Sequence, residues 1–195
     1  SQENQPTLLR SVGKIKSLEE KIKDHRTTDH IGIGHTRWAT HGNPSERNAH
    51  PHQAGSIYLV HNGIIENYKA LKEQLKDYEF KSDTDSEVLA ALIDNFYRDG
   101  KLSLEDAVSQ ALKLVEGTFG IAVLSVHDPD HLVVARSGSP LVIGLGDTET
   151  LVASDASALV GYTKKAIYLN DGEVAVLSKN NIDVKTLDLQ PVSAK

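Results

Sequence analysis

The sequence predicts an α+β domain with mainly antiparallel sheets. Short apolar stretches typical of strands occur in both halves of the chain, helix patterns lie between them, and the second half alternates strand and turn signals. Strands joined by short turns pair antiparallel, and helices segregated from strands are typical of this class. The 195 residues contain no linker-like stretch, so we expect a single domain over 1–195, with a polar lead-in over 1–30 and a core over 31–190.

The first elements are short. Apolar residues recur at helical spacing in the lead-in, which predicts a helix there; they are Val12, Ile15, Leu18 and Ile22. Residues 31–36 and 56–60 are apolar, short and bounded by glycine or polar residues, so we expect two strands. A loop rich in His, Gly, Pro and Asn separates them.

Three helices are expected in the middle of the chain. Asn67 is a good N-cap for the first, and Thr84 with Glu87 forms a T-x-x-E capping box for the second. Ser103 begins the third. The buried face of the first helix is expected to consist of Tyr68, Leu71, Leu75 and Tyr78.

Seven strands are expected after residue 118, separated by turn signals such as HDPD and NDG. They cover 119–126, 131–137, 140–146, 150–155, 166–170, 173–178 and 182–187, with one helical turn over 155–160. Many of these strands are apolar on both alternations, which predicts a sheet covered on both faces, by helices on one side and by a second sheet on the other.

Composition excludes several classes of function. The net charge is −6 and no Lys/Arg run is present, so nucleic acid is not an expected partner. The longest apolar run is far short of the roughly 20 residues that span a bilayer, so no membrane association is expected. The absence of cysteine excludes disulfides and thiolate metal sites, and it is compatible with the cytoplasm.

Five of the nine histidines cluster between residues 35 and 61: His35, His41, His50, His52 and His61. A zinc site is one interpretation. However, His50-Pro51-His52 is a bare H-x-H, there is no H-E-x-x-H, and cysteine cannot contribute. Hydrogen bonding is therefore the favoured role for these imidazoles, and we expect neither a metal nor a cofactor.

Arg37 lies beside the only tryptophan, Trp38, in the segment HTRWATHG. The pair could be a structural cation–π contact. Alternatively, the planar guanidinium of Arg37 could grip a substrate carboxylate with two parallel hydrogen bonds. We favour the second interpretation, because a long polar loop with Gly42 and Pro44 follows.

His61-Asn62-Gly63 is expected to close the second strand. Asn-Gly is a frequent turn dipeptide, but here it could equally present an amide and a backbone N–H to an oxyanion; the sequence supports both interpretations evenly. Asp85 has a similar ambiguity. An acidic residue at a helix start stabilises the helix dipole, but the same carboxylate could bind a substrate ammonium.

Six strings in this order resemble the glutaminase domain of the glucosamine-6-phosphate synthase family, also called glutamine–fructose-6-phosphate aminotransferase (isomerising). They are GHTRWATHG, NAHPH, HNGIIEN, DTDSE, ARSGSPLVIGLG and ASD. The resemblance implies an N-terminal-nucleophile hydrolase-like αββα sandwich, in which two antiparallel sheets lie between helical layers, here without the family's first strand. It also implies hydrolysis of L-glutamine to L-glutamate and ammonia for a sugar isomerase module that binds fructose 6-phosphate.

The resemblance also implies roles for individual residues. Arg37 would hold the glutamine α-carboxylate with help from Thr40 and His41, and Trp38 would belong to the loop that closes over the site. Asn62 and Gly63 would supply the oxyanion donors, Asp85 would pair with the α-ammonium, and His50 would line the pocket. Isomerase modules of the family form dimers, so a homodimer is an expected assembly.

One departure from the family is serious. Its members begin with a cysteine that acts as nucleophile and base, whereas this chain begins SQENQ and contains no cysteine. We therefore expect the chain as given to be inactive as a glutaminase. A non-catalytic module that binds glutamine or glutamate for regulation is the alternative, and a histidine-based metal hydrolase is a weaker one.

Overall fold

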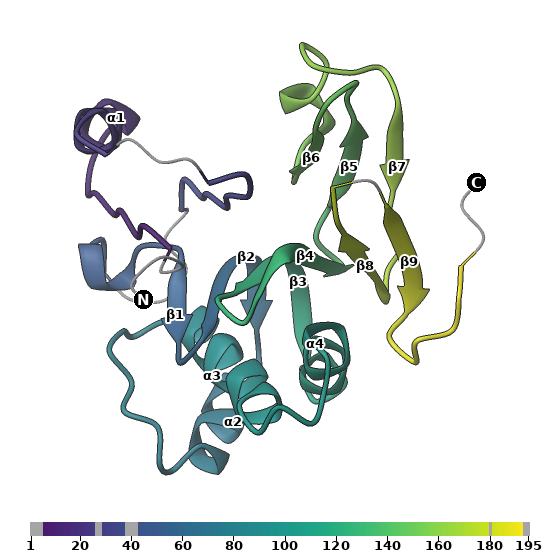
Figure 1. Cartoon of the computed structure of the whole chain (residues 1–195). Coiled ribbons are helices and arrows are strands. Elements are labelled where there is room, and N and C mark those ends of the chain that lie inside the picture. Colours follow the sequence, from purple (N-terminus) through teal and green to yellow (C-terminus); the bar gives the residue numbers. More distant parts are fainter. Residues whose placement is uncertain (1–5, 26–28, 38–42, 180, 193–195) are drawn as a thin grey trace.

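Two antiparallel β-sheets form the framework of the chain (Figure 1), and the computed structural model describes residues 6–25, 29–37, 43–179 and 181–192. The larger sheet has six strands in the order β1-β2-β3-β4-β8-β9, and the smaller has three in the order β6-β5-β7. The strands of the larger sheet are β1 (His52–Ala54), β2 (Ile57–Ile65), β3 (Gly117–Ser125), β4 (Asp128–Ser137), β8 (Glu173–Leu177) and β9 (Ile182–Thr186). Those of the smaller sheet are β5 (Val142–Leu145), β6 (Thr150–Ala153) and β7 (Ala166–Tyr168).

Three helices gather on one side of the larger sheet, while a fourth, α1, lies apart from them (Figure 1). The helices are α1 (Ile15–Lys23), α2 (Tyr68–Gln74), α3 (Asp85–Tyr97) and α4 (Leu104–Leu112), with 3₁₀ turns η1 (Glu46–Asn48) and η2 (Ala156–Ala158). Among the described residues, no helix combines the length and the apolar composition that crossing a membrane requires.

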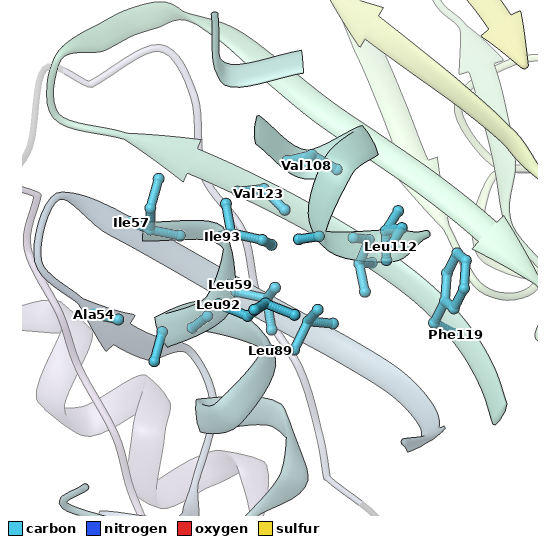
Figure 2. Close-up of a cluster of buried hydrophobic side chains, with 14 of the residues drawn as sticks. Ala54, Ile57, Leu59, Leu89, Leu92, Ile93, Val108, Leu112, Phe119 and Val123 are labelled. Atoms are coloured by element: carbon cyan, nitrogen blue, oxygen red, sulfur yellow. The ribbon is translucent and has the colours of Figure 1, made fainter. Parts of the chain in front are cut away.

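The alternating geometry of the strands divides the core into two clusters. Ile57 and Leu59 of β2 face the helices, whereas Val60 points to the opposite face of the sheet, because successive side chains of a strand alternate. Figure 2 shows the helix side, where Leu89 and Ile93 of α3 lie over β2.

The second cluster fills the space between the two sheets. Val134 of β4 and Ala175 of β8 come from the larger sheet, and Ile143 of β5 comes from the smaller one; all three are fully buried. The larger sheet is therefore covered on both faces, as its doubly apolar strands predict, and the α+β sandwich is confirmed.

Most predicted elements are present, including α1, the three later helices, all seven strands after residue 118 and the helical turn η2. Several details are wrong. Thr84 caps α3, but the Glu87 carboxylate accepts the Lys81 and Ser82 amides, so the predicted capping box is incomplete. Residues 31–36 form no strand. The second strand continues through Asn62 and Gly63 to Ile65, because it pairs with β3 along its whole length. The first of the three helices ends at Gln74, before Tyr78.

Candidate active site

A cavity of about 310 Å³ lies where strand β2 meets the first turn of α3. This volume is at the lower end of the range for small-molecule sites, about 300–1,000 Å³. Five of the eight predicted site residues line it, and the other three, Trp38, Thr40 and His41, lie outside the described residues. The lining residues are His35, Arg37, His50, His61, Asn62, Gly63, Ile64, Thr84, Asp85, Ser86 and Thr118.

Asn62 and Gly63 lie inside the β2–β3 ladder, where Asn62 is opposite Gly120 and Gly63 is opposite Phe119. The interpretation of this dipeptide as a turn is therefore wrong. Gly63 has φ 144°, and a Cβ there would lie 2.1 Å from the carbonyl oxygen of Thr118. Only glycine fits, because both the backbone angle and the close approach of β3 exclude a side chain.

The first turn of α3 provides two further contacts to β2 and the cavity. The Thr84 hydroxyl caps the helix by accepting the Glu87 amide at 3.2 Å. Asp85 reaches across to the strand instead, where its Oδ2 accepts the Ile65 amide at 2.8 Å, and its side chain is buried. Thr84 therefore supplies the cap, and Asp85 brings a carboxylate to the cavity wall.

Hydrogen bonds of the buried Asn48 side chain and an exposed ion pair fix the loop that carries His50. The Asn48 side chain donates to the Asn43 carbonyl at 3.0 Å and accepts the Asp83 amide at 3.0 Å. Arg47 also pairs with the Asp83 carboxylate. Asp83, immediately before α3, thus anchors the loop to the same helix start that carries Asp85.

Arg37 enters the cavity from an irregular segment. Its φ is 29°, a left-handed conformation that residues other than glycine rarely adopt. Its amide donates to Nδ1 of His35 at 2.8 Å, and its Nη1 donates to the Asn43 carbonyl at 3.3 Å. Arg37 and Asp85 therefore both line the cavity, which brings a basic and an acidic residue to the same space.

Three histidine rings at the cavity contact one another, one pair tilted by 42° and the other edge-to-face at 76°. The ring centroids of His35 and His50 are 4.2 Å apart, and those of His50 and His52 are 4.7 Å apart. Burial lowers the pKa of all three, with neighbouring cationic groups adding to the effect, and it lowers the pKa of His52 to about 3. These rings are neutral at pH 7. In the described part of the chain, no group of three or more His, Asp or Glu side chains is arranged to hold a metal ion.

Sequence reasoning did not find two residues that line the cavity, Ser86 and Thr118. The Ser86 hydroxyl lies between His50 and His61, and the Thr118 carbonyl lies beside His61. Ser86 could have been suspected from its place after Asp85 in a capped first turn. Thr118 gives no local signal, because its proximity depends on the pairing of β2 with β3.

Comparisons with known proteins find related sequences and a related solved structure. The chain is 54% identical to glutamine–fructose-6-phosphate aminotransferase [isomerizing] of Chlorobaculum tepidum over 93% of its length, and 46% identical to that of Haemophilus influenzae over 94%. It spans only 31% and 30% of these relatives. Among solved structures, the glutamine phosphoribosylpyrophosphate amidotransferase of B. subtilis matches 80% of the chain, and 35% of that protein is covered, at 27% identity and a TM-score of 0.66.

The sequence model of a protein family, the glutamine amidotransferase domain, matches residues 2–186, nearly the whole chain. The six sequence strings, the two-sheet sandwich and this match point to the same group of proteins. The chain belongs to the glutamine amidotransferase domain family.

Proposed function

We propose that the chain binds L-glutamine in the β2–α3 cavity and is the glutamine-hydrolysing part of an enzyme that makes glucosamine 6-phosphate. Arg37 holds the α-carboxylate and Asp85 the α-ammonium, while Asn62 and Gly63 donate to the developing oxyanion. Trp38, Thr40 and His41 complete the pocket, and His50 lines it. The observation that carries the proposal is that Arg37, Asp85, Asn62 and Gly63 line one cavity of ligand size.

The reaction also needs a nucleophile, and these 195 residues contain no cysteine. The chain as given therefore binds glutamine or glutamate without hydrolysing it. In the longer enzyme, ammonia passes to a sugar isomerase module that binds fructose 6-phosphate and that brings two copies together. The names of the similar aminotransferases and their greater length support this assignment.

A thermal-shift experiment tests the pocket. Glutamate should raise the melting temperature of the parent chain, because a ligand that binds only the folded state stabilises it. Arg37→Ala should abolish the shift, and Arg37→Lys should restore little of it, because a point charge cannot replace a two-pronged contact. Arg98→Ala, which removes an exposed arginine that contacts Asn95, is the matched control. If Arg37→Lys binds as well as the parent, Arg37 is not the carboxylate clamp.

The absence of cysteine favours the second candidate, a glutamate-binding regulatory module without catalysis. The DNA sequence upstream of the codon for Ser1 distinguishes the two candidates. A reading frame that encodes a cysteine-led segment just before Ser1 supports the enzyme, and a start codon or an unrelated domain there supports the regulatory module. Glutaminase activity of the 195 residues alone would contradict both, because it requires a different nucleophile.

A further inference from the structure

One hydroxyl group joins two histidines of the cavity wall. Ser86 Oγ lies 3.1 Å from Nε2 of His50 and 3.0 Å from Nδ1 of His61. All three side chains are buried, with exposed fractions of 3%, 9% and 3% for Ser86, His50 and His61. A serine hydroxyl has one proton to donate, so it can donate to only one of the two rings.

The Thr118 carbonyl decides which ring accepts. Its oxygen lies 3.3 Å from Nε2 of His61. A carbonyl only accepts, so Nε2 of His61 carries a proton, and in the neutral form of the ring Nδ1 is an acceptor. In that form Ser86 donates to His61 and accepts a hydrogen bond from Nε2 of His50.

The remaining nitrogen of His50 supports this direction. Among the described residues, Nδ1 of His50 is buried and has no hydrogen-bond partner. With the proton on Nε2, Nδ1 is an unprotonated acceptor without a donor. The opposite direction, with a charged His61, would make it a buried N–H without an acceptor, and orphaned buried N–H groups are rarer than under-satisfied acceptors.

The same helix turn holds β2 on both sides of Asn62 and Gly63. Asp85 binds the strand at the Ile65 amide, and Ser86 binds it at the His61 ring. The two contacts flank the dipeptide at either end. Neither contact involves Asn62 or Gly63 itself. The side-chain amide of Asn62 and the backbone N–H of Gly63 are therefore positioned by the residues on either side of them.

We propose that Ser86 is a positioning residue: it links His50 to His61, whose own proton the Thr118 carbonyl keeps on Nε2, so that the proton of His50 also lies on Nε2, and together with Asp85 it holds Asn62 and Gly63 at the cavity wall. The functional part rests on the proposed role of Asn62 and Gly63 as oxyanion donors. The proton positions do not depend on that role, so the two can fail separately.

Long-range ¹H–¹⁵N NMR spectra of the ¹⁵N-labelled chain test the proposal, because they report which ring nitrogen carries the proton. We expect both His50 and His61 to carry it on Nε2. In Ser86→Ala, His61 should keep its tautomer because the Thr118 carbonyl remains, whereas His50 should become a mixture. The amide signals of Asn62 and Gly63 should shift, and glutamate should bind about tenfold more weakly.

Ser109→Ala is the matched control, since this buried serine of α4 donates to the Leu187 carbonyl and lies outside the cavity. It should leave the histidine signals and the glutamate affinity unchanged. Ser86→Thr, which keeps the hydroxyl, should restore the His50 tautomer.

A proton on Nδ1 of His50 in the parent chain overturns the proposal, as does Ser86→Ala with unchanged histidine signals. If Ser86→Ala does not fold, the parent spectrum still decides. Correct tautomers in a chain that does not bind glutamate would support the positioning role and overturn the proposed function instead.

Discussion

Two regions next to the larger sheet differ in what they bury: the space between the two sheets, and the junction where β2 meets the first turn of α3. The space between the sheets is filled by apolar side chains such as Val134, Ile143 and Ala175. The junction of β2, the histidine loop and α3 instead gathers nine of the buried polar side chains. They are Asn48, His50, His52, His61, Ser82, Thr84, Asp85, Ser86 and Glu87.

Burying a polar group costs about 1–3 kcal/mol unless it finds a partner. The junction meets this requirement by sharing partners. The Thr84 hydroxyl lies 2.9 Å from the Ser82 hydroxyl and 3.1 Å from Nε2 of His52, and it also caps α3. A core built from many buried polar groups loses more solvation free energy than an apolar core, so such a network is expected at a functional site. We infer that the apolar space between the sheets is the scaffold and that the polar junction is the site.

The largest expected effect is that of Gly63→Ala in the junction. The new Cβ would lie 2.1 Å from the Thr118 carbonyl oxygen at a φ of 144°. We expect a loss of more than about 4 kcal/mol in the free energy of unfolding, measured by urea denaturation. Gly161→Ala is the control, because its Cβ would meet nothing within 4 Å. A Gly63→Ala variant as stable as the parent would show that the β2–β3 pairing is looser than described.

Ile143→Ala tests the scaffold side. Ile143 is fully buried between the sheets, so its truncation should cost about 2–5 kcal/mol through lost burial and the cavity left behind. The glutamate affinity of the folded fraction should stay that of the parent, measured by calorimetry well below the melting temperature. Ile15→Ala, at an exposed residue of α1, should change neither quantity. A weakened affinity in Ile143→Ala would break the division into scaffold and site.

Two helix caps compare the regions directly. Ser103→Ala removes a complete capping box at the exposed start of α4 and should cost about 1 kcal/mol. Thr84→Ala removes the cap of α3 and also the contacts of the Thr84 hydroxyl with the Ser82 hydroxyl and with Nε2 of His52, so it should cost about 2 kcal/mol or more. Denaturation curves of the two variants give the difference. Equal losses would mean that the network around Thr84 adds nothing to the cap.

Local patterns predicted most of the fold, because strand alternation, capping residues and turn signals depend on neighbours along the chain. Two errors arise where contacts outside the local pattern decide. Glu87 completes a T-x-x-E pattern, but its carboxylate accepts the Lys81 and Ser82 amides rather than that of Thr84. Likewise, Asn62-Gly63 has the sequence of a turn, and the pairing with β3 keeps it in a strand.

The sequence indicated which residues belong to the site better than it indicated how they lie relative to one another. Arg37, His50, Asn62, Gly63 and Asp85 line one cavity, which spacing alone could not show. Their roles remain predictions. The contact of Asp85 with the Ile65 amide was not predictable either, because it joins segments that are 20 residues apart.

The last prediction concerns the pH dependence of the free energy of unfolding, to which the buried histidines contribute. Burial and, to a smaller extent, the charges of Arg10 and Arg37 together lower the pKa of His52 to about 3, whereas in the unfolded chain the pKa is about 6.5. Between these values the unfolded state binds one proton more than the folded state. Stability from His52 is therefore fully present above about pH 6.5 and is lost by about 1.4 kcal/mol per pH unit below it. In His52→Gln, the free energy of unfolding should fall less steeply between about pH 6.5 and about pH 5.5 by that amount. The variant still carries the lowered pKa of His50, so some slope should remain. Identical slopes in the two proteins would show that His52 takes up a proton inside the fold, and that the buried junction tolerates this charge.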